Sequence, residues 1–145
     1  MQIHTILVPT DFSPCAAQAL RRAIALAKHG GGEIHLLHAY ELPIPLGFGE
    51  PAIALPQEFF DQVRERAQQH LDELAAQVGA EGVKVHTYLT CDAPARAILE
   101  TAQSLKADLI VMGTRGLTGV KHMLLGSVAE RTVRLAPCAV LTVKS

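Results

Sequence analysis

Five short apolar segments alternate with segments of helical periodicity along this 145-residue chain, and this alternation constrains the fold more than any other feature. Strands that alternate with helices need crossover connections, which require a parallel sheet with helices packed against it. The pattern therefore predicts an α/β fold with a doubly wound, five-stranded parallel sheet and helices on both faces. The expected strands span 3–8, 34–39, 83–89, 108–112 and 139–143, and the expected helices begin near residues 14, 57, 94 and 127.

Local signals at the ends of these segments support the same element order. Ser13 and Pro14 are typical of a helix N-terminus, with serine as the cap and proline at the first helical position. The run Gly30-Gly31-Gly32 predicts the end of that helix. No linker or repeat interrupts the chain, so we expect one domain over residues 1–145. The proline-rich segment 41–56 excludes both helix and sheet interior, and a lid, a partner surface and disorder are all open for it.

Charge and composition exclude several classes of function. Thirteen Lys and Arg against fourteen Asp and Glu give a net charge of −1, without the basic surplus of a nucleic-acid or anionic-membrane binder. Aromatic residues make up only 4% of the chain and Trp is absent, which argues against base-stacking surfaces. No apolar run approaches the roughly 18–20 residues of a membrane span, and the N-terminal segment does not resemble a signal peptide. We expect a soluble, cytoplasmic protein that binds neither nucleic acid nor membrane.

The nucleophile and metal motifs that can be read from a sequence are absent. The three cysteines are widely spaced without a C-x-x-C pair, so we expect small buried thiols in a reducing compartment. His35 and His38 are three apart on one strand and point to opposite faces, while His86 and the other histidines fall on different elements. We therefore predict no dedicated metal site. A Gly-x-Ser-x-Gly nucleophile elbow is also missing.

The most specific motif is the spacing Gly113-x2-Gly116-x9-Gly126-Ser127, between the fourth strand and the last helix. Gly113 would let the backbone turn off the strand, and Gly116 would permit a close approach. Gly126 and Ser127 stand at a helix N-terminus, where free amides and the helix dipole favour an anion. The alternative for Ser127 is a capping box with Glu130, and the two interpretations are compatible.

Two stretches of this chain resemble the universal stress protein family, the UspA superfamily. The first is Ile6-Leu-Val-Pro-Thr-Asp-Phe-Ser, and the second begins at Val111-Met-Gly-Thr-Arg-Gly and continues through Gly126-Ser-Val-Ala-Glu-Arg. The resemblance covers the whole chain, and the glycine spacing coincides with the ATP-binding signature of the family's nucleotide-binding branch. It implies an adenine-nucleotide α-hydrolase-like, Rossmann-like fold and an ATP-binding role in regulation or stress response.

The resemblance also implies where ATP, or another adenine nucleotide, would lie. Asp11 would accept hydrogen bonds from the ribose, the backbone of Ala39 would read the adenine edge, and the Gly126–Val128 segment would hold the outer phosphates. Mg²⁺ or Mn²⁺ would be bound through the phosphates. Simpler alternatives are a turn aspartate at Asp11 and a solvated charge at Arg115. The implied site comprises Pro9, Thr10, Asp11, Ala39, Met112, Gly113, Arg115, Gly116, Gly126, Ser127 and Val128.

Catalysis has weak support in the sequence. His122 and Glu130 are the only candidates for a base near the loop, so we assign no catalytic residue and expect at most slow ATP hydrolysis. Two alternatives to a binding module are a nucleotide-processing enzyme, such as an ATPase or an adenylate-forming enzyme, and a nucleotide-free dimeric scaffold. The intact glycine signature argues against the scaffold, and the lack of an evident base argues against the enzyme.

The C-terminal strand and the local charge suggest what the protein contacts. Segment 138–144 is apolar and would lie at an edge of the sheet, where pairing with a second copy would cover it; the family resemblance also implies a homodimer. A regulatory protein partner, of unknown identity, is also expected. Residues 113–134 hold four basic residues and one acidic residue in a chain that is otherwise acidic. This distribution predicts one small basic patch near the glycine loop.

Overall fold

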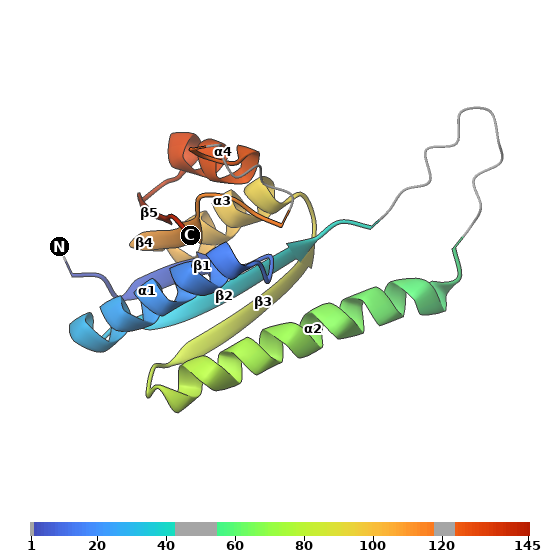
Figure 1. Cartoon of the computed structure of the whole chain (residues 1–145), viewed down its shortest axis with the longest axis horizontal. Coiled ribbons are helices and arrows are strands. Elements are labelled where there is room, and N and C mark those ends of the chain that lie inside the picture. The colour runs from blue at the N-terminus through green and yellow to red at the C-terminus, as the bar shows by residue number, and fades with distance from the viewer. Residues whose placement is uncertain (1, 43–54, 118–123) are drawn as a thin grey trace.

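The computed structural model describes residues 2–42, 55–117 and 124–145. Strands and helices alternate in these residues as the sequence predicts (Figure 1). In chain order the elements are β1 (Thr5–Pro9), α1 (Pro14–Gly30), β2 (Glu33–Tyr40), α2 (Gln57–Ala80), β3 (Val85–Cys91), α3 (Pro94–Leu105), β4 (Leu109–Gly113), α4 (Ser127–Leu135) and β5 (Ala139–Val143).

The five strands form one sheet in the order β3-β2-β1-β4-β5, and every neighbouring pair is parallel. The chain builds the sheet outward from β1 to β2 and β3, and then crosses back to add β4 and β5 on the other side of β1. The direction of winding therefore reverses between β1 and β4. This confirms the predicted doubly wound parallel sheet, and ligands of such sheets bind at this reversal.

Helices cover both faces of the sheet (Figure 1). On one face, α1 and α2 pack against alternate strand residues such as Ile6, Val8 and Leu36, with Leu71 of α2 fully buried. On the other face, residues of α3 and α4 pack against the intervening strand residues, which include Ile110. The two-residue alternation of each inner strand thus supplies two separate apolar clusters.

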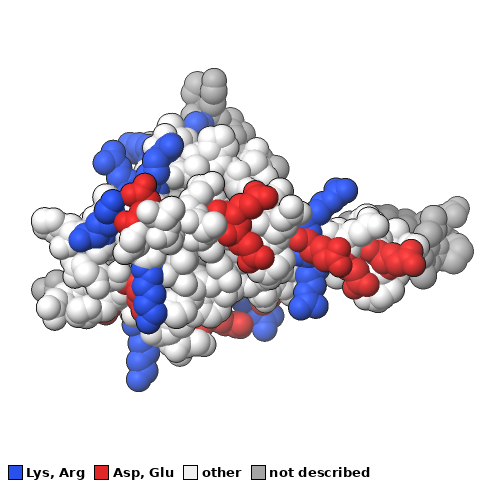
Figure 2. All heavy atoms as spheres, turned by 90° about the horizontal axis from the view of Figure 1, so that it is seen from below, with Lys and Arg blue, Asp and Glu red and all other residues white. Residues whose placement is uncertain are grey.

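Charged residues of the long helix α2 lie on its solvent side, as its helical periodicity predicts. Arg64, Arg66, Asp72 and Glu73 are all exposed. Figure 2 shows acidic and basic side chains together on the face it displays. Within the described residues, no helix combines the length and the apolar character that crossing a membrane would require.

Several element boundaries differ from the predictions, and strand pairing explains the differences. β1 begins at Thr5 rather than at residue 3, because its ladder with β2 starts at the pair Thr5–Glu33. β3 spans Val85–Cys91 rather than 83–89, because its ladder with β2 ends at the pair Tyr40–Cys91. Residues 43–54 of the proline-rich segment lie outside the described residues.

Cysteine burial departs from expectation at one position. Cys15 is buried and Cys138 is partly buried, but Cys91 at the end of β3 is exposed. Burial raises the pKa of the Cys138 thiol. All three thiols are free, so none of them crosslinks the fold.

Candidate functional site

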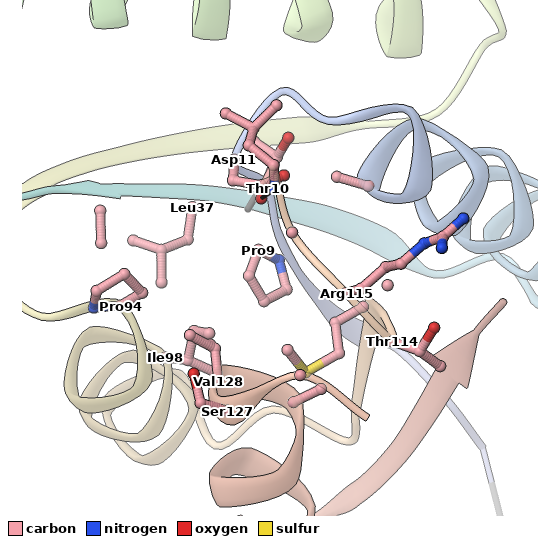
Figure 3. A pocket seen from close by; sticks show the side chains of 18 residues that line it. Pro9, Thr10, Asp11, Leu37, Pro94, Ile98, Thr114, Arg115, Ser127 and Val128 are labelled. Carbon is pink, nitrogen blue, oxygen red and sulfur yellow. Dashed lines mark hydrogen bonds between the residues drawn. The ribbon is translucent and has the colours of Figure 1, made fainter. Parts of the chain in front are cut away.

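A cavity of about 380 Å³ opens at the carboxyl ends of β1, β2 and β4 (Figure 3). It lies where the winding of the sheet reverses, between β1 and β4. In doubly wound sheets the loops on the two sides of this point diverge and leave a crevice. The volume falls within the roughly 300–1,000 Å³ that small-molecule sites occupy.

All eleven residues of the expected site line this one cavity. Three segments far apart in the sequence contribute them: the end of β1 with the turn after it, the end of β2, and the stretch from the end of β4 to the start of α4. Seven further residues line the cavity that the motif does not predict; Pro94 and Ile98, for example, come from α3, which carries no part of the glycine motif. The missed lining residues are Ala16, Leu37, Pro94, Ile98, Thr114, Leu117 and Ala129.

The turn after β1 is held by its own side chains and by β2. Thr10 is buried; its amide donates to the carbonyl of Leu37 at 2.8 Å, and its hydroxyl accepts from the amide of Phe12 at 3.0 Å. His38 Nδ1 lies 2.7 Å from the carbonyl oxygen of Thr10. Phe12 takes a left-handed φ of 63°, which is unusual for a residue with a Cβ. These contacts fix the turn that carries Asp11.

Asp11 connects the two sides of the cavity through its carboxylate. Its Oδ1 accepts from the amide of Ser13 at 3.0 Å, as in an Asx turn. Its Oδ2 accepts from the amide of Leu117, also at 3.0 Å, across the cavity in the loop after β4. Asp11 is therefore both the turn aspartate of the simpler interpretation and a tether for the glycine loop. Each carboxylate oxygen retains a second lone pair for a further donor.

Two glycines of the motif are required by close approaches rather than by unusual backbone angles. A Cβ at Gly116 would lie 2.5 Å from Asp11 Oδ2. A Cβ at Gly113 would lie 2.8 Å from Cys15 Sγ. Gly113 belongs to β4 and has no positive φ, so the prediction that it turns the backbone off the strand is wrong. It allows β4 to pack closely against α1.

The N-terminus of α4 faces the cavity without a side-chain cap. Its cap residue is Gly126, with φ −69° and ψ 166°, and Ser127 is already the first helical residue. The proposed capping box of Ser127 with Glu130 is therefore wrong. The first amides of α4 are left without a side-chain partner among the described residues. Helix N-terminal amides of this kind are anion-binding groups.

Charged side chains near the loop are engaged elsewhere. The Arg115 guanidinium reaches Ser145, with Nη2 at 3.2 Å from its hydroxyl oxygen, and in Figure 3 it points away from Ser127 and Val128. Glu130 is paired with Arg134 at 3.3 Å and does not line the cavity, which removes it as a candidate base. Lys121 and the other candidate base, His122, lie outside the described residues.

Comparison with known proteins relates this architecture to one family. The model of the universal stress protein family matches residues 2–144. The chain belongs to that family. A universal stress protein from Thermus aquaticus is 40% identical over 142 residues, covering 97% of this chain and 98% of the relative. The family resemblance in the sequence is thus confirmed.

Solved structures extend the likeness to three dimensions. MJ0577 of Methanocaldococcus jannaschii superposes with a TM-score of 0.84 at 26% identity, over 100% of this chain and 98% of its own. A universal stress protein solved in complex with cAMP has a TM-score of 0.74 at 26% identity, over 99% of this chain and 98% of its own. Both cover the whole sheet, so the fold is that of other universal stress proteins.

One prediction about the histidines is wrong. We expected His35 and His86 to be separated because they fall on different elements. The parallel ladder between β2 and β3 pairs them directly, and their rings stack with centroids 4.6 Å apart. Together with Glu33 they form a cluster of three side chains that can bind a metal ion, far from the glycine loop in sequence. Period-two spacing already placed Glu33 and His35 on one face of β2, but strand register is not readable from the sequence.

Proposed function

We propose that this universal stress protein binds an adenine nucleotide in the cavity between β1 and β4 and acts as a regulatory module. The observation that carries the proposal is the convergence of the eleven motif residues on one cavity. The related universal stress protein solved with cAMP supports an adenine nucleotide as the ligand class. ATP is the proposed ligand because the glycine spacing matches the ATP-binding signature of the family.

The cavity lining fits the parts of a nucleotide. Leu37, Ile98 and Pro94 offer apolar surface for a base, and the backbone of Ala39 lies at the same end of β2. Asp11 supplies an acceptor for ribose hydroxyls through the lone pairs that its two amide contacts leave free. The uncapped N-terminus of α4 supplies donors for phosphate oxygens.

A divalent cation fits this arrangement through the nucleotide rather than through the protein. The lining contains one carboxylate, Asp11, and no other acidic side chain among the described residues. Mg²⁺ or Mn²⁺ would therefore be held by phosphate oxygens and water, which hard cations accept readily. When bound, the cation would neutralise phosphate charge next to the helix terminus.

A binding role is better supported than turnover. Phosphoryl transfer needs a positioned base or water and a charge clamp. Glu130 is paired with Arg134, and the guanidinium of Arg115 contacts Ser145. At most slow hydrolysis is proposed, with no catalytic residue assigned.

Protein partners that bind the surface would respond to whether the cavity holds a nucleotide. The loop that Asp11 tethers leads into α4 and then into the edge strand β5. We propose a homodimer through segment 138–144, where Leu141 is 39% exposed, and a regulatory protein partner that senses the bound state.

Mass spectrometry of small molecules released from the purified, denatured protein tests the proposal. We expect intact ATP or another adenine nucleotide, retained for hours in the presence of Mg²⁺. Rapid conversion of added ATP to ADP or AMP would favour the nucleotide-processing enzyme. Failure to bind ATP at millimolar concentration, measured calorimetrically with and without Mg²⁺, would overturn both functions and leave the dimeric scaffold.

A further inference from the structure

A polar cluster lies at the amino-terminal end of β2 and β3, on the face of the sheet that also carries Leu37 and Tyr88. Glu33 begins β2 and His35 follows two residues later, so both side chains share one face. His86 of β3 is the ladder partner of His35. The carboxylate oxygen and the two imidazole nitrogens lie within 4.8 Å of one another.

Glu33 connects the two histidines. Its Oε1 lies 2.9 Å from His35 Nε2, and its Oε2 lies 3.6 Å from His86 Nε2. The two carboxylate oxygens therefore each face a ring nitrogen of one histidine. Two imidazoles and one carboxylate are the donor set of many zinc sites.

The surroundings hold the ring of His35 in one orientation, with Nε2 toward Glu33. Its side chain is only 6% exposed, and its Nδ1 lies 2.9 Å from the hydroxyl of Tyr88. Ligating histidines characteristically direct the second ring nitrogen to such an outer partner, which fixes the tautomer and the ring. In the metal-free protein Nε2–H donates to the Glu33 carboxylate, and Nδ1 accepts from the Tyr88 hydroxyl. A metal ion at Nε2 would replace that proton, and Nδ1 would then be protonated and donate to the Tyr88 oxygen.

Only small movements separate this cluster from a coordination sphere. Ligands about 2.0–2.1 Å from a tetrahedral ion are roughly 3.4 Å apart. The Glu33–His86 separation of 3.6 Å is close to that value. His86 is 40% exposed at the edge strand and can tilt toward His35, while the open side leaves room for water as a fourth ligand.

We propose that Glu33, His35 and His86 bind a divalent transition metal ion of the zinc class, with Tyr88 as the positioning residue for His35. The site clamps the edge strand β3 to β2. It is built at the amino ends of the strands, whereas the nucleotide cavity lies at their carboxyl ends. Ala39 lies six residue steps along β2 from Glu33, which corresponds to about 20 Å. The proposal is therefore independent of nucleotide binding.

Lys84 would compete with the metal ion for the carboxylate of Glu33. Its Nζ lies 3.0 Å from Glu33 Oε2, and its side chain is 70% exposed. A bound cation would displace the ammonium into water, and the two cannot share the same carboxylate oxygen without repulsion. Removing Lys84 should therefore strengthen metal binding, which a merely structural histidine pair would not predict.

Isothermal titration of the untagged, nucleotide-free protein with ZnCl₂ tests the site. We expect saturable one-to-one binding of zinc and none of Mg²⁺, which prefers oxygen ligands. His86→Gln should lower the zinc affinity at least about tenfold, and Tyr88→Phe about tenfold. Lys84→Gln should raise the affinity severalfold. His29→Gln, at the exposed end of α1, is the matched control and should bind zinc as the wild type does.

The outcomes separate a built site from adventitious binding. Melting temperatures of the metal-free variants show whether each one folds, and zinc should raise the melting temperature of the wild type more than that of His86→Gln. Absence of saturable binding at millimolar zinc would overturn the proposal. Equal losses in His86→Gln and His29→Gln would also overturn it, because they would indicate nonspecific histidine binding. Because no nucleotide is present, neither result bears on the proposed nucleotide site.

Discussion

At the scale of single residues, the close approach of Asp11 to Gly116 determines the local geometry of the site. Asp11 Oδ2 bonds the amide of Leu117 and lies where a Cβ of residue 116 would have to be. Glycine at position 116 is therefore required by the protein's own contact with Asp11, whether or not a ligand is bound. The same contact places an ionised acceptor at the mouth of the cavity.

Replacement of Gly116 by alanine tests this contact. The added Cβ would meet Asp11 Oδ2 at 2.5 Å, so the carboxylate must move and release Leu117. A hydrogen bond to a charged group contributes about 1.5–3 kcal/mol, and we expect ATP affinity to fall by about tenfold or more. Calorimetric titration measures the affinity, and far-UV circular dichroism should be unchanged.

Gly79→Ala is the matched control, because nothing lies within 4 Å of a Cβ at that helical position. It should bind ATP normally and gain up to about 1 kcal/mol in the free energy of unfolding. The double variant Asp11→Ala/Gly116→Ala should lose less stability than the two single losses added together. Additive stability losses, or normal ATP binding by Gly116→Ala, would refute the role given to this contact.

At the scale of elements, two serines at helix starts have opposite roles. Ser13 is buried and caps α1, with its Oγ accepting from the amide of Ala16 at 3.1 Å. Ser127 caps nothing and faces the cavity. Ser13→Ala should therefore cost about 0.5–2 kcal/mol in chemical denaturation, and Ser127→Ala less than about 0.5 kcal/mol.

ATP affinity should be lowered in the variant that keeps its stability, Ser127→Ala, and little changed in Ser13→Ala. Ser127→Ala removes a hydroxyl next to the proposed phosphate position, so ATP binding should weaken by about tenfold while stability holds. Ser13→Ala should bind ATP nearly as the wild type does at a temperature where it is folded. A large stability loss in Ser127→Ala would mean that its side chain caps α4 after all.

Asp108, which precedes β4, is hydrogen-bonded to the start of β1, and we expect the strength of this contact to depend on pH. Asp108 Oδ2 accepts from the amides of His4 and Thr5, each at 2.9 Å. The bond from Thr5 and then the bond from His4 lower the pKa of Asp108. Because the folded pKa lies below the unfolded value of about 3.9, this stabilisation is complete above that value and is lost as the pH falls through the folded pKa.

Asp108→Asn tests the pH dependence. Its deficit in the free energy of unfolding, relative to the wild type, should be about 1–3 kcal/mol at pH 6 and should shrink below about pH 4. Urea denaturation at both pH values measures it. Glu73→Gln on the exposed side of α2 is the control, with changes within about 0.5 kcal/mol. A deficit that is equal at the two pH values would contradict the assignment.

Sequence patterns predict elements better than they predict contacts between elements. The order of strands and helices follows from the alternation of apolar and helical segments, and the expected edge position of the last strand is confirmed for β5. The eleven motif residues also converge as the family resemblance implies. The register between β2 and β3 does not follow from the sequence, because a shift by two residues keeps the same side chains on each face. The pairing of His35 with His86 could therefore not be predicted. The α3 residues Pro94 and Ile98 were missed because packing, rather than a motif, brings them to the cavity.

At the scale of the whole molecule, the proposed homodimer would bury apolar surface at β5, and α4 carries further exposed apolar residues. Leu141 of β5, Val133 and Leu135 are 39%, 47% and 52% exposed. β5 pairs only with β4 among the described strands, so one edge of its backbone is free to pair. Exposed apolar edges of this kind are usually covered in soluble proteins.

Leu141→Lys tests the proposed homodimer. A charge on this strand should oppose association, and light scattering coupled to size-exclusion chromatography should change from the mass of a dimer to that of a monomer. Leu26→Lys on α1 is matched in exposure, at 38% against 39%, and should remain a dimer. Dimers of equal stability in both variants would place the interface elsewhere.

Amide chemical-shift mapping by NMR during an ATP titration tests whether the nucleotide binds in the cavity between β1 and β4. We expect the largest shifts at Gly113, Gly116, Ser127 and Val128, where the cavity meets the β4–α4 loop and the start of α4. Amides near Glu33 and His86, at the opposite ends of the strands, should shift little. The absence of saturable shifts at millimolar ATP, or shifts centred away from the cavity, would contradict the account.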